Sequence, residues 1–157
     1  MRRVTVAFLW LWAGAAWALT APFQLFDLGP LTLEAPPTMV LTRGGIDSVA
    51  GFLADEKLHL NYDFGLNTDS LQAPSGAVDF QAFAMTLDGL PARFVSYRAD
   101  DRTGQAQVCA GIHVPQVRGS ARGRVGLTLL ACGPSADSIQ QARAIFSSVR
   151  LRSGEAR

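Results

Sequence analysis

Two aspartates, Asp47 and Asp63, lie near the two ends of the most strongly patterned stretch of the chain, Gly44 to Gly65. Asp47 and Asp63 could serve as the paired carboxylates of a small hydrolase or as part of a cation site. Two carboxylates supply fewer than the roughly six to eight oxygens that Ca²⁺ prefers. The alternative is that both side chains form hydrogen bonds to backbone groups in turns. We name Asp47 and Asp63 as candidate binding residues and assign no catalytic residue.

Three arginines form a second candidate group. Arg118, Arg122 and Arg124 lie close together in the glycine-containing segment RGSARGR. Guanidinium groups beside flexible glycines could bind a phosphate or a carboxylate through paired hydrogen bonds. The alternative is a solvated hairpin tip. We therefore expect either a small anionic ligand or no ligand at this loop.

The two cysteines are predicted to form a disulfide. Cys109 and Cys132 lie in two alternating segments, and pairing them directly places Gly111 opposite Leu130 and His113 opposite Thr128. An exported chain is the setting in which cysteines pair; two buried thiols are the alternative. Cys109 and His113 are four residues apart on one strand, about 13 Å, which is too far for proton transfer.

Other catalytic and metal-binding motifs are missing from the sequence. It has no C-x-x-C, H-E-x-x-H, G-x-S-x-G, Walker or EF-hand pattern, and only two histidines. We expect no cofactor and no metal. The chain has 14 basic and 13 acidic residues, and without Arg2 and Arg3 the acidic residues outnumber the basic ones by one. This balance argues against nucleic acid as a partner.

The N-terminus has the pattern of a secretory signal peptide. Met1-Arg2-Arg3 precedes an apolar run that ends in the small-residue pattern Ala16-Trp17-Ala18. We expect a signal peptide at residues 1–18, one domain at 19–157, and a periplasmic or secreted location. An uncleaved anchor is the alternative, and membrane contact is expected only through such a leader.

The candidate residues need a scaffold, which the alternation of residue types predicts to be mainly β-sheet. Leu58, Leu60, Tyr62 and Phe64 alternate with polar residues, so the stretch 44–65 is expected to form a hairpin with one buried face. Residues 65–77 read as the longest loop, which would be functional or mobile.

The rest of the chain is expected to complete an antiparallel sheet and add one helix. Val78 to Leu87 is apolar on both faces, as in a central strand covered on both sides. A helix is predicted from about 138 to 147, packed over Phe83 and Met85. The predicted fold class is therefore α+β, an antiparallel meander with one C-terminal helix on a sheet face.

The stretches Gly45-Ile46-Asp47-Ser48, Gly51-Phe52 and Tyr62-Asp63-Phe64-Gly65 resemble a segment of small exported bacterial proteins of unknown function. The Leu90-Pro91-Ala92-Arg93 strand and the helix containing Ile145-Phe146 fit the same resemblance. The domain that it implies is similar in layout to the PsbP type. It implies an exported bacterial α+β domain and carries no active site across.

The expected function is a non-enzymatic binding or accessory protein of the cell envelope. Its partner would be an envelope protein or a small anionic ligand. The alternative is a small secreted hydrolase using Asp47, Asp63 or the arginine loop.

Overall fold

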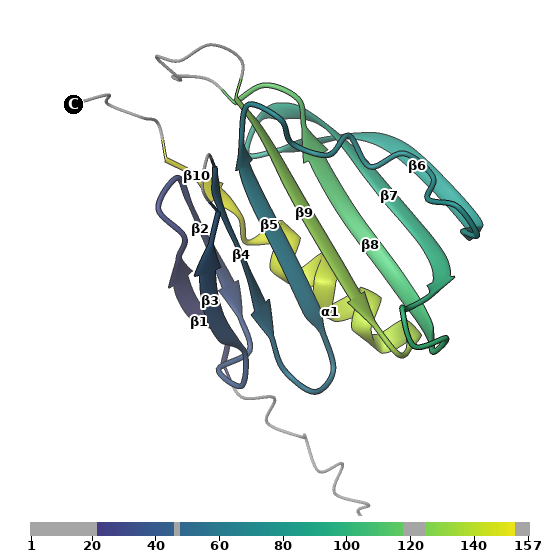
Figure 1. Ribbon diagram of the computed structural model, residues 1–157. Coiled ribbons are helices and arrows are strands. Elements are labelled where there is room, and N and C mark those ends of the chain that lie inside the picture. Colours follow the sequence, from purple (N-terminus) through teal and green to yellow (C-terminus); the bar gives the residue numbers. More distant parts are fainter. Residues whose placement is uncertain (1–21, 46–47, 118–124, 153–157) are drawn as a thin grey trace, which may run out of the picture.

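The computed structural model describes residues 22–45, 48–117 and 125–152. These residues form two antiparallel sheets and one helix (Figure 1). The elements are β1 (Gln24–Asp27), β2 (Leu31–Ala35), β3 (Val40–Gly44), β4 (Val49–Ala54), β5 (His59–Gly65), β6 (Val78–Leu87), β7 (Leu90–Asp100), β8 (Ala106–Val114), β9 (Gly126–Gly133), α1 (Ala136–Ser147) and β10 (Arg150–Leu151).

The larger sheet has seven strands in the order β3-β4-β5-β9-β8-β7-β6. It consists of two meanders, β3 to β5 and β6 to β9, which join where β5 pairs with β9. The predicted hairpin is present as β4 and β5. Leu58, Leu60 and Tyr62 are buried, whereas His59 and Asn61 between them are exposed, so the alternation predicted the buried face correctly.

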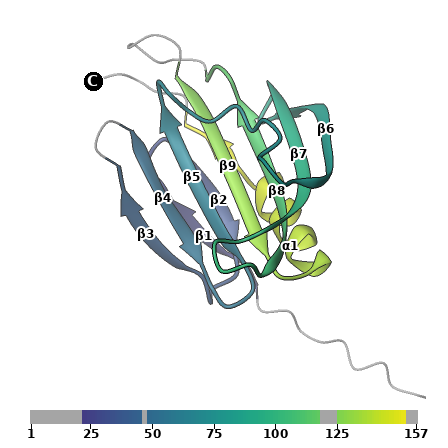
Figure 2. The same ribbon diagram turned by 45° about the vertical axis from the view of Figure 1, so that its right-hand side comes forward.

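The second layer covers one face of this sheet. It contains the three-stranded sheet β1-β2-β10 and, beside it, helix α1 (Figure 2). Leu31, Leu33 and Ala35 of β2 are fully buried in the core, together with Leu60, Ile112 and Leu129 from the larger sheet. We call the covered side of the seven-stranded sheet its inner face and the opposite side its outer face. The expected α+β class is confirmed, but a meander alone does not describe the two sheets.

Helix α1 contributes Ala142, Ile145 and Phe146 to the core, and the partly buried Ile139 packs against it. It begins at Ala136 after the N-cap residue Ser135, two residues earlier than expected. The helix lies against β8, β9 and β2. The expectation that it covers Phe83 and Met85 is wrong, because these side chains remain 51% and 37% exposed.

Strand β6 is also placed differently from the prediction. Its apolar residues on both faces predicted a central, covered strand, but β6 is the edge strand of the seven-stranded sheet. Nearly all of its residues are exposed. Alternation reports which faces are apolar, whereas the position of a strand in a sheet depends on distant pairing partners that no local pattern contains.

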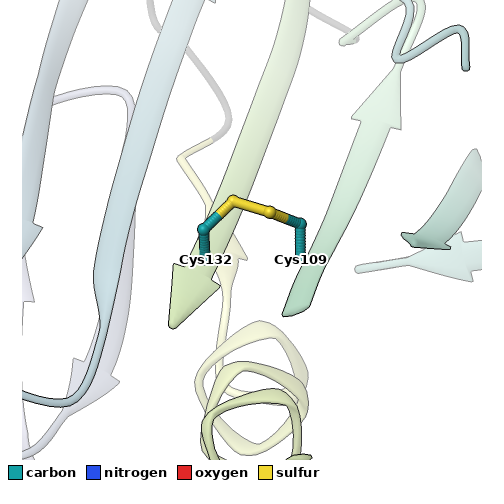
Figure 3. The surroundings of a disulfide bond; sticks show 2 residues. All are labelled: Cys109 and Cys132. Carbon is teal, nitrogen blue, oxygen red and sulfur yellow. A yellow bond between two sulfur atoms is a disulfide. The ribbon is translucent and has the colours of Figure 1, made fainter. Parts of the chain in front are cut away.

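The predicted disulfide joins Cys109 of β8 to Cys132 of β9 (Figure 3). The register is the expected one, with Gly111 opposite Leu130 and His113 opposite Thr128. Both cysteines lie on the outer face, since their neighbours Ala110 and Ala131 point into the core. Within the described parts of the chain, no helix is both long and apolar enough to cross a membrane.

Candidate functional site

A hollow of about 420 Å³ lies on the outer face of the seven-stranded sheet, above β4, β5 and β9. We call it the outer-face recess. Small residues of β3 and β4 border one side, and Phe52, two carboxylates and the loop after β5 border the others. Its lining residues are Gly44, Gly45, Ala50, Gly51, Phe52, Asn61, Tyr62, Asp63, Asp69, Leu71, Thr128 and Leu130.

The strand register sets a row of polar side chains across this face. Asp63 on β5 is opposite Thr128 on β9, Thr128 is opposite His113 on β8, and His113 is opposite Arg93 on β7. Residues directly opposite each other on neighbouring strands share a face and lie about 5 Å apart. The sequence had assigned no function to Thr128 or Arg93, and the sheet order brings them into line with Asp63.

The loop between β5 and β6 lies over the same face and closes one side of the recess. The hydroxyl of Thr128 donates to the carbonyl oxygen of Asp69 at 2.6 Å. The carboxylate of Asp69 in turn accepts from the backbone N–H of Leu71 at 2.7 Å. Leu71 is buried above Gly111, where a Cβ atom would lie 2.7 Å from its Cδ1. The guanidinium group of Arg93 also donates to the carbonyl oxygen of Ser70, at 3.4 Å. The loop is therefore held on the sheet by two hydrogen bonds and the apolar contact of Leu71.

His113 is anchored to the same threonine. Its Nδ1 lies 3.2 Å from Thr128 Oγ1. Because the single hydroxyl proton of Thr128 goes to Asp69, Nδ1 must donate and Nε2 carries the lone pair of the neutral ring. Burial lowers the pKa of His113 below its usual value; the nearby charge of Asp69 opposes this shift and that of Arg93 adds to it. The folded environment of His113 therefore favours the neutral form of the imidazole.

Asp63 carries the clearest polar irregularity in the site. Its Oδ1 is inaccessible to solvent, and among the described residues no donor lies within hydrogen-bond distance of it. An unpaired buried carboxylate oxygen is costly. Of the residues proposed from sequence, Asp63 is therefore placed on the wall of a recess with an unused acceptor.

The other predicted site residues fall outside the described ranges. Asp47 follows Gly45 in a part of the chain that is not described, and Arg118, Arg122 and Arg124 belong to the undescribed segment 118–124. The carboxylate pair and the arginine loop therefore remain predictions. His59 is exposed and stacks on Phe52 with ring centroids 4.8 Å apart.

A wider depression of about 1040 Å³ lies near the β4–β5 turn and the Pro36-Pro37 segment. One of its carboxylates, that of Asp55, already accepts hydrogen bonds from the backbone of Lys57 and Leu58 and from the hydroxyl of Thr38. These contacts shape the turn. The outer-face recess differs because one of its carboxylate oxygens has no such partner.

Sequence reasoning missed Asp69, Leu71 and Thr128 as members of one site. Thr128 and Asp69 are 59 residues apart, and no local period links a loop to a strand at that separation. The available signals were the length of the loop and the glycine in the interior of a predicted strand, since an interior glycine often marks close approach of another segment. Among the described residues, no group of three or more His, Cys, Asp or Glu is arranged to hold a metal ion.

The sequence matches no protein family. It also matches no curated protein. The fold is similar to that of a protein from Bacteroides thetaiotaomicron VPI-5482 whose crystal structure was determined at 1.50 Å resolution, with a TM-score of 0.53 and 9% sequence identity. The match covers 85% of this chain and 49% of that one, so the chain spans about half the length of its structural neighbour. At this identity the likeness shows the fold alone.

Proposed function

We propose that the chain is an exported, non-enzymatic binding or accessory protein of the bacterial cell envelope, and that its outer-face recess binds a small primary amine. The observation that carries the proposal is the carboxylate of Asp63, which lines the 420 Å³ hollow and has no ion-pair partner among the described residues; its buried Oδ1 has no described hydrogen-bond donor either. The resemblance to small exported bacterial proteins of PsbP-like layout is part of the same proposal.

The chemistry of the lining favours a cationic ligand. Asp63 and Asp69 supply two carboxylates, and Phe52 presents an aromatic ring beside them. An ammonium group is attracted to carboxylates and to the face of an aromatic ring. The small residues of β3 and β4 leave room for the body of the ligand, and Leu71 and Leu130 give it apolar contacts.

The polar groups around the recess support binding rather than catalysis. Thr128 is only 6% exposed and its hydroxyl proton is engaged by a carbonyl oxygen. His113 donates to Thr128 and so helps to hold the loop. A nucleophile needs an accessible oxygen and a base that accepts its proton. In this pair the histidine donates a proton to the threonine oxygen and does not accept one from it.

The disulfide supports a location outside the cytoplasm, where such bonds form and persist. The signal peptide and the periplasmic or secreted location stay predictions. Protein recovered from the envelope fraction should begin at Leu19, which sequencing of its N-terminus would check. A mature protein that still begins at Met1 would contradict the signal peptide.

Binding can be tested by NMR on ¹⁵N-labelled, disulfide-intact protein. Titration with 1,4-diaminobutane should shift the backbone signals of Asn61, Asp63 and Thr128, whereas glucose and sodium acetate should leave them unchanged. The Asp63→Asn variant keeps the shape of the side chain and removes its charge. It should weaken amine binding by about 10-fold or more, because hydrogen bonds to charged groups are the stronger ones.

The matched control is Asp100→Asn, since Asp100 is an exposed carboxylate at the end of β7 that does not line the recess. This variant should bind the amine as the natural chain does. Equal weakening by both substitutions would indicate a general charge effect, and acetate binding at the recess in place of the amine would overturn the proposed ligand class.

A further inference from the structure

Strand β6 combines an exposed edge with an apolar surface on both of its faces. Its residues from Phe80 to Leu87 carry no charge and no proline. Val78 is 53% exposed and Phe83 is 51% exposed. Proteins usually protect an edge strand of this length with charged residues, proline or a covering segment. The one irregularity in β6 is a register shift between Val78 and Gln81, which leaves the strand regular from Gln81 onward.

A groove of about 480 Å³ adjoins this edge on the inner face, between β6 and the C-terminal half of α1. Phe83, Met85 and Phe94 line its strand side, and Phe146 and Val149 line its helix side. In Figure 2, β6 lies at the edge of the sheet beyond the helix. The edge strand and the groove therefore form one continuous apolar surface, which we call the β6 surface.

We propose that the β6 surface is the interface of a homodimer, in which β6 pairs antiparallel with β6 of a second copy about a two-fold axis. This pairing would make β6 a central strand of a continuous sheet, the position that its two-sided apolar pattern is typical of. The partner strand must itself be apolar on both faces and uncharged over about eight residues. β6 meets these requirements for its own copy.

Charge also favours a second copy. One end of β6 carries Asp79, which is ion-paired with the exposed Arg98. The turn at the other end carries Asp88, which lines the groove together with Arg150. Antiparallel pairing about a two-fold axis places each end beside the opposite end of the partner. Asp79 and Arg98 of one copy then lie near Asp88 and Arg150 of the other, so arginine and aspartate are present on both sides of each contact. The uncharged middle of β6 faces the uncharged middle of the partner strand.

The inner face of such a pair explains the exposed aromatic residues. Phe83 and Met85 point toward the side on which the helix lies, because they are opposite Phe94 and Ala92 of β7. In a symmetric pair both residues would meet their own copies or near neighbours beside the groove. Burial of exposed Phe and Met side chains is a main source of interface stability.

The proposal is tested by measuring the mass of the disulfide-intact chain in solution by sedimentation velocity over a concentration series. The expected result is a monomer–dimer equilibrium. Phe83→Lys and Ala84→Lys should each raise the dimer dissociation constant by about 100-fold or more, since each buried charge occurs twice in a two-fold interface. Circular dichroism should show the sheet retained, because both positions are exposed in the single chain.

The matched control is Val40→Lys, an exposed apolar position on β3, the opposite edge strand of the same sheet. It should leave the dimer intact. A cysteine introduced by Ala84→Cys offers a second readout, because the two natural cysteines are already joined to each other. Mild oxidation should then cross-link two copies through residue 84.

Three outcomes would overturn the proposal. The chain could remain monomeric at every concentration, which would leave the strand of a different protein as the occupant of this edge. A dimer could persist in both β6 variants, or Val40→Lys could dissociate it as strongly as Phe83→Lys. In the last two cases the dimer contact lies elsewhere on the molecule.

Discussion

Leu71 occupies the space that a side chain at Gly111 would need. A Cβ atom at position 111 would lie 2.7 Å from Leu71 Cδ1 and 3.0 Å from the carbonyl oxygen of Leu129. Leu71 belongs to the loop after β5, whereas Gly111 is in the middle of β8. The close approach therefore fixes how the loop lies over the outer face and, with it, one wall of the recess.

Gly111→Ala should destabilise the protein by about 1–3 kcal/mol, because the added methyl group forces Leu71 or the neighbouring strand to move. Urea unfolding followed by far-ultraviolet circular dichroism would measure the loss of stability. The loop amides of Asp69 and Leu71 should exchange faster in this variant. In the background Leu71→Ala the same substitution should cost less, and strictly additive costs would contradict a direct contact.

Loss of the disulfide should lower the free energy of unfolding by about 3 kcal/mol, the chain-entropy value for a crosslink that spans 23 residues. The comparison is between the natural chain and the double variant Cys109→Ser and Cys132→Ser in urea. Reductant should lower the stability of the natural chain and leave that of the variant unchanged. Equal stability of the two proteins would show that the bond adds nothing to the native hairpin.

The cysteine hairpin could be predicted to the residue because two independent constraints agree on it. Alternation placed both cysteines on one face, and a disulfide between neighbouring strands requires them to be directly opposite. That pairing also fixes the positions of Gly111 and His113. Local pattern and covalent geometry together were sufficient here.

The second layer could not be predicted in the same way. β2 pairs with β10, so Thr32 lies opposite Arg150 although most of the chain separates the two residues in the sequence. A two-residue strand such as β10 has no periodicity to detect. The sheet that Leu31 and Leu151 join is decided by packing around α1, which no local pattern in the sequence contains.

The candidate site could also be predicted only in part from the sequence. Asp63 could be proposed from its place in the predicted hairpin, whereas Asp69 and Thr128 come together only through the pairing of β5 with β9 in the sheet. The arginine segment 118–124 lies outside the described residues, so anion binding by Arg118, Arg122 and Arg124 stays a prediction.

The hydroxyl of Tyr62 is buried, and no partner for it lies among the described residues. Burial raises the pKa of this tyrosine, although the nearby charge of Arg43 opposes the shift. Tyr62→Phe should therefore change the free energy of unfolding by less than about 1 kcal/mol, because it removes a desolvated group that makes no described hydrogen bond. Tyr62→Ala should cost about 3–5 kcal/mol through loss of the ring. A large cost for Tyr62→Phe would reveal a hydrogen bond to the hydroxyl in solution.

His113 should make the protein less stable as the pH falls below about 6.5. Its pKa in the folded state is lowered, chiefly by burial, so the unfolded chain binds the proton more readily than the folded one. The resulting stability is fully present above the unfolded pKa of about 6.5 and is lost as the pH falls through the folded pKa. Protonation adds charge to a ring held against Thr128 under the loop.

The measurement is the free energy of unfolding between pH 7.5 and pH 5, a window above the usual range of carboxylates. His113→Gln should flatten the slope in this range. The control is His59→Gln, since His59 is exposed on the same face and its replacement should leave the slope in place. If His59→Gln flattened the slope and His113→Gln did not, the burial of His113 under the loop would not be the origin of the pH dependence.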